Sequence, residues 1–135
     1  MRNLKKLAVF SVLSLAMGIA HAAPCNGFEV KIKNNLPDDF LVSKIELQGA
    51  ELQPSGFQKL NGHSEQVFTV NNSKDDKKMT GTLEFHTISL PSKSVTVRFD
   101  LENKTVLCAH DDKGSGGDYP VNKTRLPGQV AYTIG

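Results

Sequence analysis

Short runs in which apolar and polar residues alternate recur along this chain. In the run Phe28–Lys33, FEVKIK, every second residue is apolar. A β-strand places successive side chains on opposite faces, so such a run predicts a strand with one buried face. No long stretch has the i, i+3, i+4, i+7 apolar spacing of an amphipathic helix. The pattern therefore predicts an all-β protein.

Further strands are predicted between segments rich in glycine, proline, asparagine and aspartate. They are Phe40–Leu47, a short one near Phe57–Leu60, Glu65–Asn71, Met79–Ile88, Ser94–Leu101, Thr105–His110 and Gln129–Ile134. The irregular alternation of the first of these indicates a β-bulge. The charged run NNSKDDKK between the third and fourth predicts a hairpin tip. Seven or eight short strands with turn signals between them predict an antiparallel β-sandwich or flattened barrel.

The first 22 residues have a different character from the rest. They begin with basic residues at Arg2, Lys5 and Lys6, continue as the apolar run Leu7–Ala20, and end on small residues up to Ala22. This order predicts a secretory signal peptide that is cleaved after Ala22. The apolar run is shorter than the roughly 20 residues that span a bilayer. We therefore expect an exported protein, either periplasmic or secreted.

Without this segment, residues 23–135 form a single predicted domain that is close to neutral. The whole chain carries 16 basic and 14 acidic residues, and three of the basic ones lie in the first 22 positions. The remainder therefore has a net charge near −1, despite the basic isoelectric point of about 8.6 for the whole chain. Nucleic-acid binding needs a clustered basic face, which this balance does not indicate.

The domain contains two cysteines, Cys25 before the first strand and Cys108 in a late one. Export to an oxidising compartment predicts that they form a disulfide. The bond would tie the beginning of the domain to its end. It would close a loop of roughly 80 residues, which the chain-entropy model values at about 4 to 5 kcal/mol.

The layout of the middle of the chain resembles a known family. The run VKIKNN, Gly49-Ala50, a proline-containing loop, an apolar strand and the run MTGTLEF at Met79–Phe85 follow the order of elements in aegerolysins. Aegerolysins are small β-sandwich proteins that bind lipids. The resemblance covers Val30 to Phe99 and rests on pattern, without a diagnostic motif. It implies recognition of membrane lipids and cooperation with a pore-forming partner.

Motifs for catalysis are absent from the sequence. It has no Gly-x-Ser-x-Gly, no His-Glu-x-x-His and no Cys-x-x-Cys. A disulfide would also leave no thiol nucleophile. We therefore expect a protein that is not an enzyme and needs no cofactor, with a metal-dependent hydrolase or one with scattered catalytic residues as an alternative.

Metal binding is the sharpest chemical hypothesis. Glu84 and His86 lie two apart in a predicted strand and so share a face. His110, Asp111 and Asp112 add imidazole and carboxylate groups, which are ligand types that metals accept. Convergence of the two strands would make Glu84, His86 and His110 weak candidate ligands. The simpler interpretation is that Glu84 and His86 form the polar half of an amphipathic strand.

The stretch AHDDKGSGGDYP, residues 109–120, is the candidate binding loop, represented by Asp111, Asp112, Asp118 and Tyr119. Its spacing matches neither an EF-hand calcium loop nor a phosphate-binding loop. Its three glycines predict a flexible surface loop, anchored at one end by the disulfide of Cys108.

Three aromatic residues, Phe40, Phe57 and Tyr119, lie at or beside predicted loops. Gathered at one end of the sandwich, they would form a patch for a lipid or another partner, although Phe40 and Phe57 could instead cap the core. The function that the sequence favours is an exported, non-enzymatic binding protein whose partner is an unidentified protein or surface ligand. The alternatives are an aegerolysin-like protein that interacts with membrane lipids, and the hydrolase.

Overall fold

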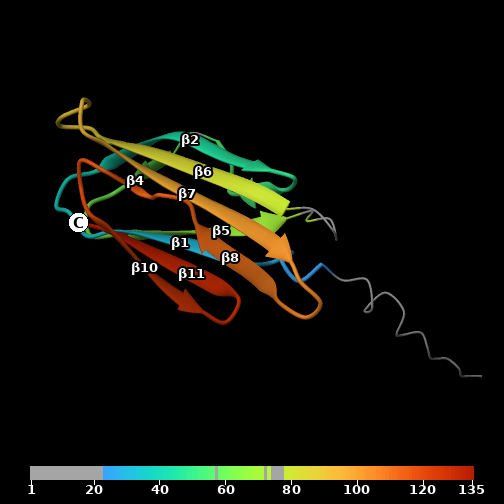
Figure 1. Cartoon of the computed structure of the whole chain (residues 1–135). Coiled ribbons are helices and arrows are strands. Elements are labelled where there is room, and N and C mark those ends of the chain that lie inside the picture. The colour runs from blue at the N-terminus through green and yellow to red at the C-terminus, as the bar shows by residue number, and fades with distance from the viewer. Residues whose placement is uncertain (1–22, 57, 72, 74–77) are drawn as a thin grey trace, which may run out of the picture.

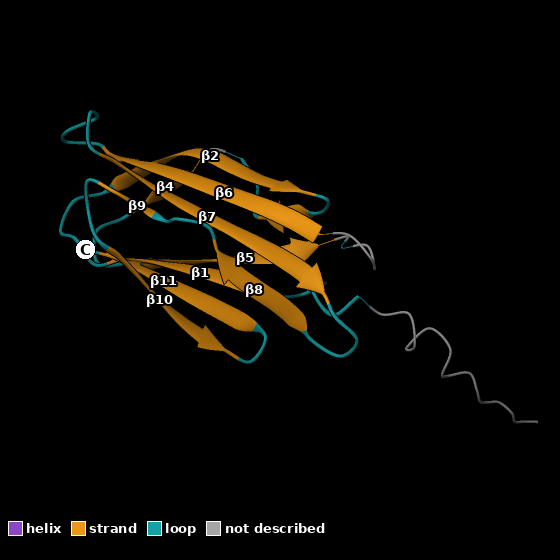
Figure 2. Cartoon of the chain, viewed as in Figure 1, coloured by secondary structure: helices purple, strands orange, loops and turns teal. Residues whose placement is uncertain are grey.

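The alternating runs of the sequence form two β-sheets that face each other (Figure 1). The computed structural model describes residues 23–135 except residues 57, 72 and 74–77. Within these residues it contains strands, turns and loops (Figure 2). The described part of the chain has no helix long and apolar enough to cross a bilayer. The predicted all-β class is confirmed, and the arrangement is an open sandwich instead of a flattened barrel.

The first sheet joins the two ends of the domain. Its strands are, in order, β10 (Val121–Leu126), β11 (Gln129–Ile134), β1 (Glu29–Asn34), β5 (Glu65–Asn71) and β3 (Glu51–Gln53). The first strand, β1, runs parallel to the last, β11, and antiparallel to β5. The beginning and end of the domain therefore pair at the centre of this sheet.

The second sheet contains the longest strands. Its order is β4 (Gln58–Leu60), β2 (Phe40–Gln48), β6 (Lys78–Thr87), β7 (Ser94–Asn103) and β8 (Cys108–Asp112), and the short β9 (Gly116–Gly117) pairs with β7. The register of β2 against β6 shifts between Val42 and Lys44. This shift is the bulge that the irregular alternation predicts.

The core lies between the sheets and takes every second residue of the central strands. Along β7, for example, Val95, Val97, Phe99 and Leu101 are all fully buried. The ring of Phe99 lies against Gly81 of β6, where an added Cβ would come within 2.3 Å of a ring atom. Glycine is therefore required in the middle of this strand because only its missing side chain leaves room for the ring.

The predicted disulfide is confirmed. Cys25 and Cys108 are bonded with an S–S distance of 2.05 Å and are 83 positions apart in the sequence. Cys25 precedes β1 of the first sheet and Cys108 begins β8 of the second. The bond therefore fastens the two sheets together at one end of the sandwich.

Several predicted elements are wrong, and each error has a physical reason. The described residues form eleven strands, where seven or eight were expected. β10 was expected to be loop because its sequence, VNKTRL, is mostly polar. A strand at the edge of a sheet commonly has such a sequence. The run NNSKDDKK does not connect a hairpin, because β5 and β6 belong to different sheets. Thr105–Leu107 lies in a turn, so that β8 begins at Cys108.

Candidate functional site

Two hairpin turns lie at the same end of the sandwich as the disulfide (Figure 1). One is residues 104–107, between β7 and β8, and the other is residues 127–128, between β10 and β11. A guanidinium nitrogen of Arg125, on β10, donates a hydrogen bond to the carbonyl oxygen of Cys108, on β8, at 2.8 Å. We call residues 104–107 and 125–128 together the tip surface.

The tip surface exposes large apolar side chains. Val106 is 84% exposed, Leu107 is 53% exposed and Leu126 is 47% exposed. Single exposed apolar residues are common on soluble proteins, but two in succession on one turn, Val106 and Leu107, are a candidate site of interaction. Among the described residues the only other large hydrophobic side chains this exposed are Ile88 and Leu90, in the turn between β6 and β7 at the opposite end.

Basic side chains accompany these apolar groups. Residues 104–107 and 125–128 contain Lys104 and Arg125 and no aspartate or glutamate, and Lys123 lies further along β10. Lys104 forms a surface ion pair with Glu102 at 3.2 Å, a type of pair that contributes little. Among the described residues, neither Lys123 nor Arg125 forms an ion pair with a carboxylate.

Arg125 also holds the β10–β11 turn in place. Its guanidinium lies 4.8 Å from the centre of the Phe28 ring, which is a cation–π contact. It donates to the carbonyl oxygens of Leu126 and of Gln129 as well as to that of Cys108. Arg125 thus connects the β10–β11 turn to the start of β8, where the disulfide is attached.

A cluster of polar groups lies between β8 and β11, next to the tip surface. The buried hydroxyl of Tyr132 lies 2.7 Å from Nε2 of His110 and donates to Oδ1 of Asp112 at 3.1 Å. Asp112 also accepts hydrogen bonds from the hydroxyl and the backbone N–H of Ser115. Each of these side chains therefore has a hydrogen-bond partner within the protein.

Burial and hydrogen bonds shift the pKa values in this cluster. Burial lowers the pKa of His110, and the positive charge of Arg125 lowers it further. Burial also raises the pKa of Tyr132 above its usual range, an effect that the charge of Asp112 strengthens. Burial of Asp112 acts to raise its pKa, but hydrogen bonds from Ser115, Gly114 and Tyr132 outweigh it and lower the pKa. Near pH 7 these directions give a neutral imidazole, a neutral phenol and a carboxylate.

An open hollow of about 320 Å³ lies beside the cluster and is lined by Asp112, Ser115, Val121, Asn122, Lys123 and Tyr132. Perturbed ionisable groups beside a concavity are a common sign of a functional site. Here, however, the phenol of Tyr132 and the carboxylate of Asp112 are already bonded to each other and to neighbours. The arrangement connects the two sheets. Lys123, which forms no ion pair among the described residues, lines the hollow beside it.

The structure does not bring the predicted metal ligands together. Glu84 and His86 share the outer face of β6, with Oε1 and Nε2 3.9 Å apart, as their spacing predicts. His110 instead packs inside the sandwich, between the rings of Phe28 and Phe99. No group of three or more metal-binding side chains occurs among the described residues.

The predicted binding loop is held against the sheet along most of its length. Asp111 and Asp112 belong to β8, and Gly116–Gly117 pairs with β7 as β9. Asp118 accepts a hydrogen bond from the backbone N–H of Ser94 at 2.8 Å. The expectation of a flexible loop over residues 111–119 is therefore wrong for most of this segment. The reason is that its glycines allow the backbone to lie close against β7, where a Cβ on Gly117 would come within 2.4 Å of a carbonyl oxygen.

Of the predicted aromatic patch, Phe40 and Tyr119 do not form an exposed pair. Phe40 is fully buried and packs against Phe85 and Tyr119, so it belongs to the core. Tyr119 is half-buried by the same contact. Phe57 lies outside the described residues.

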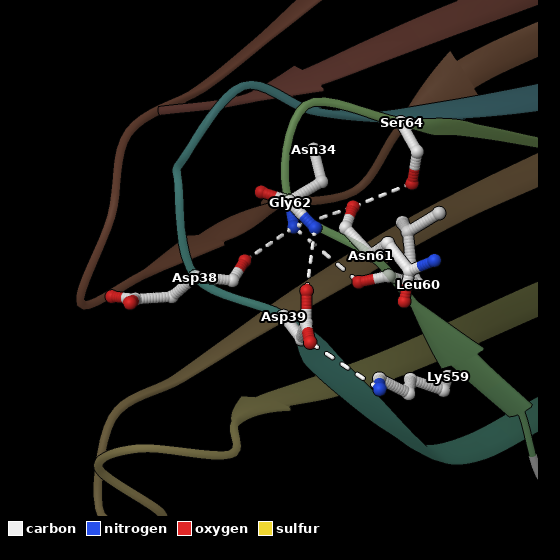
Figure 3. Close-up of polar contacts among 8 residues, drawn as sticks. All are labelled: Asn34, Asp38, Asp39, Lys59, Leu60, Asn61, Gly62 and Ser64. Atoms are coloured by element: carbon white, nitrogen blue, oxygen red, sulfur yellow. Dashed lines mark hydrogen bonds and ion pairs between the residues drawn. The ribbon is translucent and has the colours of Figure 1, made fainter.

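The opposite end of the sandwich is closed by a different polar network (Figure 3). The buried side-chain amide of Asn34 donates to the carbonyl oxygens of Asp38, Leu60 and Asn61, and its oxygen accepts from the N–H of Leu36. The carboxylate of Asp39 accepts from the N–H of Gly62 at 2.8 Å, which lowers the pKa of Asp39. These bonds connect the loops 35–39 and 61–64, and their role is structural.

Comparison with known proteins assigns no family. No known family model matches the chain, and no curated protein matches it either. Function is therefore inferred from the residues themselves. Val106, Leu107 and Leu126 were not candidates from the sequence, because Thr105–His110 was predicted as a strand and Leu126 fell in the segment predicted as loop before Gln129. The turn signal Asn103-Lys104 just before them was the available clue.

Proposed function

We propose that this chain is an exported, non-catalytic binding protein that engages its partner through the tip surface. The observation that carries the proposal is the exposure of Val106 and Leu107 on the β7–β8 turn and of Leu126 at the end of β10, the strand whose Arg125 bonds Cys108. Water penalises the exposure of apolar surface by about 25 cal/mol per Å². Covering these side chains on binding would recover that free energy.

The rigidity of the tip surface supports the same proposal. Binding through a mobile loop costs conformational entropy, whereas a preformed surface avoids much of that cost. The Cys25–Cys108 disulfide fixes the start of β8, which follows the first turn, and Arg125 connects β10 to it before any partner arrives. This use of the disulfide gives it a role in binding in addition to its role in stability.

Binding accounts for the polar cluster more simply than catalysis does. A general acid or base must reach a substrate, and a nucleophile must be exposed to it. The phenol of Tyr132 is fully buried and bonded to His110 and Asp112. We assign the cluster to the positioning of β8 and β10, the strands that carry the tip surface.

The test compares variants at the two ends of the sandwich. Purified protein comprising residues 23–135 is mixed with membranes from a bacterial cell envelope, which contain lipids and proteins, and the bound fraction is measured after sedimentation. The variant Val106→Ser/Leu107→Ser removes apolar groups from the tip surface. The variant Ile88→Ser/Leu90→Ser removes similar groups from the opposite turn and is the matched control.

We expect the native protein and the Ile88→Ser/Leu90→Ser variant to bind equally, and the Val106→Ser/Leu107→Ser variant to lose most of its binding. All four side chains are exposed, so both variants should fold, which circular dichroism checks. Absence of binding by the native protein, or equal loss in both variants, would refute the proposal.

A further inference from the structure

We infer that the free edge of β10 binds an extended segment of a partner protein by strand addition, and that this segment carries carboxylates at alternate positions. This surface differs from the exposed turn of Val106 and Leu107, and the inference goes beyond the proposed function without depending on it. In strand addition the backbone of the guest pairs with an open sheet edge, and its alternate side chains determine specificity.

The first argument is that β10 is an open edge. It is the outermost strand of the first sheet and pairs with β11 alone among the described residues (Figure 1). The residues from Asn122 to Leu126 are exposed. Many edge strands are very short or are interrupted by a bulge or a proline. β10 keeps an unbroken register over six residues and contains no proline, so its backbone suits a guest strand.

The second argument is that backbone groups point outward from this edge at regular intervals. The turn 127–128 joins Leu126 to Gln129, and a two-residue hairpin turn is closed by a hydrogen-bonded pair, which recurs at every second residue. At the other end the N–H of Gly135 donates to the carbonyl oxygen of Pro120 at 2.9 Å, in the same alternation. The even-numbered residues of β10 therefore bond to β11. The odd-numbered residues direct their N–H and C=O groups away from it, and they are Val121, Lys123 and Arg125.

The third argument is charge, which selects the guest. Lys123 and Arg125 lie two positions apart on the face of β10 that is directed toward the second sheet, because they pair with the buried Tyr132 and Val130. The nitrogens of Arg125 already donate to carbonyl oxygens, so Arg125 contributes its charge, whereas the ammonium group of Lys123 has no carboxylate partner among the described residues. A guest strand places every second side chain on this face, about 6.8 Å apart. Carboxylates at alternate positions would therefore lie beside the two cations.

The same cations oppose a second copy of this chain as the occupant. If two β10 strands paired antiparallel about a two-fold axis, the inward-facing residues of both copies would share one face. Lys123 and Arg125 of one copy would then lie opposite those of the other, and like charges opposite each other in a sheet are destabilising. Inward-pointing charges are one means by which proteins prevent such association of edges. The edge therefore disfavours itself and favours an acidic guest.

The hollow of about 320 Å³ beside β10 gives the guest side chains room. On the β10 side it is lined by Val121, Asn122 and Lys123. Asp112 also lines the hollow, but its carboxylate already accepts a hydrogen bond from the hydroxyl of Ser115. A carboxylate of the guest that enters the hollow would therefore find its partner in Lys123.

The experiment titrates synthetic peptides into the same purified protein, labelled with ¹⁵N, and follows its backbone amides by NMR. The first probe is an octapeptide that alternates threonine and glutamate. The second has lysine in place of glutamate, and the third is the glutamate peptide methylated at every backbone nitrogen, which keeps the charge and removes the donors. We expect the glutamate peptide alone to shift the amide resonances of Val121, Lys123 and Arg125 and to slow their hydrogen exchange.

Each control peptide removes one part of the inference. Equal binding of the methylated peptide would show that charge alone makes the contact, and equal binding of the lysine peptide would show that charge does not select the guest. Absence of any change at these amides with the glutamate peptide would show that the edge takes no such strand. Any of these three results would overturn the inference.

Charge reversal supplies a matched pair of variants. Lys123→Glu should weaken binding of the glutamate peptide about fivefold or more and should allow the lysine peptide to bind instead, since one cross-strand pair of opposite charge is worth up to about fivefold. Lys33→Glu is the control, because Lys33 is an exposed lysine of β1, two strands from the edge in the same sheet. Equal effects of the two variants would contradict the inference.

A second copy is distinguished by protein concentration. If the amides of Lys123 and Arg125 become protected as the concentration rises without peptide, and sedimentation shows a dimer, the occupant is a second copy and the inference is wrong. Failure of all peptides leaves the proposed function standing, because its test depends on Val106 and Leu107 and on envelope membranes.

Discussion

The hydroxyl of Tyr132 lies 2.7 Å from Nε2 of His110, and this contact joins β11 of one sheet to β8 of the other. The hydroxyl donates its single hydrogen to the carboxylate of Asp112, which can only accept. Nε2 of His110 must therefore carry the hydrogen that the hydroxyl accepts. One phenol thus fixes both the tautomer of His110 and the position of Asp112.

Removal of this hydroxyl should destabilise the fold. In Tyr132→Phe the N–H of His110 loses its partner inside the protein, and leaving a buried group unpaired costs about 1 to 3 kcal/mol. We expect the free energy of unfolding in urea, followed by circular dichroism, to fall by about that amount. Tyr119→Phe is the control and should change it by less than about 0.5 kcal/mol, because Tyr119 is half-buried and its hydroxyl has no hydrogen-bond partner among the described residues. Equal stability of Tyr132→Phe and the native protein would show that the contact is not made in solution.

The lowered pKa of His110 should make stability depend on pH. Burial disfavours the charged ring, as do Arg125 and Lys123 of β10, while Asp112 and Asp111 of β8 act in the opposite direction. The unfolded chain takes up a proton near pH 6.5 and the folded chain only at lower pH. In that interval the unfolded state binds more protons, so stability is complete above about pH 6.5 and is lost as the pH falls below it.

His110→Gln tests this sign, because glutamine does not titrate. The free energy of unfolding of the native protein, measured by urea titration between about pH 5 and pH 7.5, should decrease toward the acidic side. The decrease should be smaller in His110→Gln. Parallel curves for the two proteins would show that His110 does not couple protonation to folding.

Much of the fold could be predicted from sequence because buried and exposed positions alternate so regularly in the central strands. β1, β5, β7 and β11 follow this pattern, and their predicted bounds agree closely with the structure. β10 could not be found in this way because it lies at a sheet edge. Its inward-facing positions include Lys123 and Arg125, whose charged ends remain at the rim. Which strands share a sheet also depends on contacts that the alternation does not encode. For this reason the run NNSKDDKK was predicted to be a hairpin tip.

The candidate site was harder to predict for a related reason. Val106 and Leu107 have the composition of a strand and the position of a turn, and only the register of β7 against β8 reveals the difference. The glycines and carboxylates of residues 109–120 pointed to a neighbouring segment, half of which pairs with β7. The cysteine pair was predictable because two cysteines allow a single intramolecular pairing.

The disulfide should contribute a large part of the stability. It closes a loop of 83 residues, for which the chain-entropy model gives about 4 to 5 kcal/mol at the upper end. Cys25→Ser/Cys108→Ser should therefore lower the free energy of unfolding by up to this amount, and reduction of the native protein should have the same effect. Thiol labelling of unreduced protein in denaturant should find no free cysteine. Labelling of two thiols would disprove the bond, and an unchanged urea midpoint on reduction would disprove its contribution.

The polar network at the opposite end makes Gly62 intolerant of a side chain (Figure 3). A Cβ at this position would lie 2.2 Å from the carbonyl oxygen of Pro37, a backbone atom that cannot move aside without breaking the bonds of Asn34. Gly62→Ala should therefore lower the free energy of unfolding by about 1 to 3 kcal/mol, as overpacking does elsewhere. Asn61→Ala is the control, because Asn61 takes part in the network through its backbone carbonyl. Urea unfolding of both variants decides the question, since equal stabilities would mean that the two loops separate easily and that the network does not constrain this end.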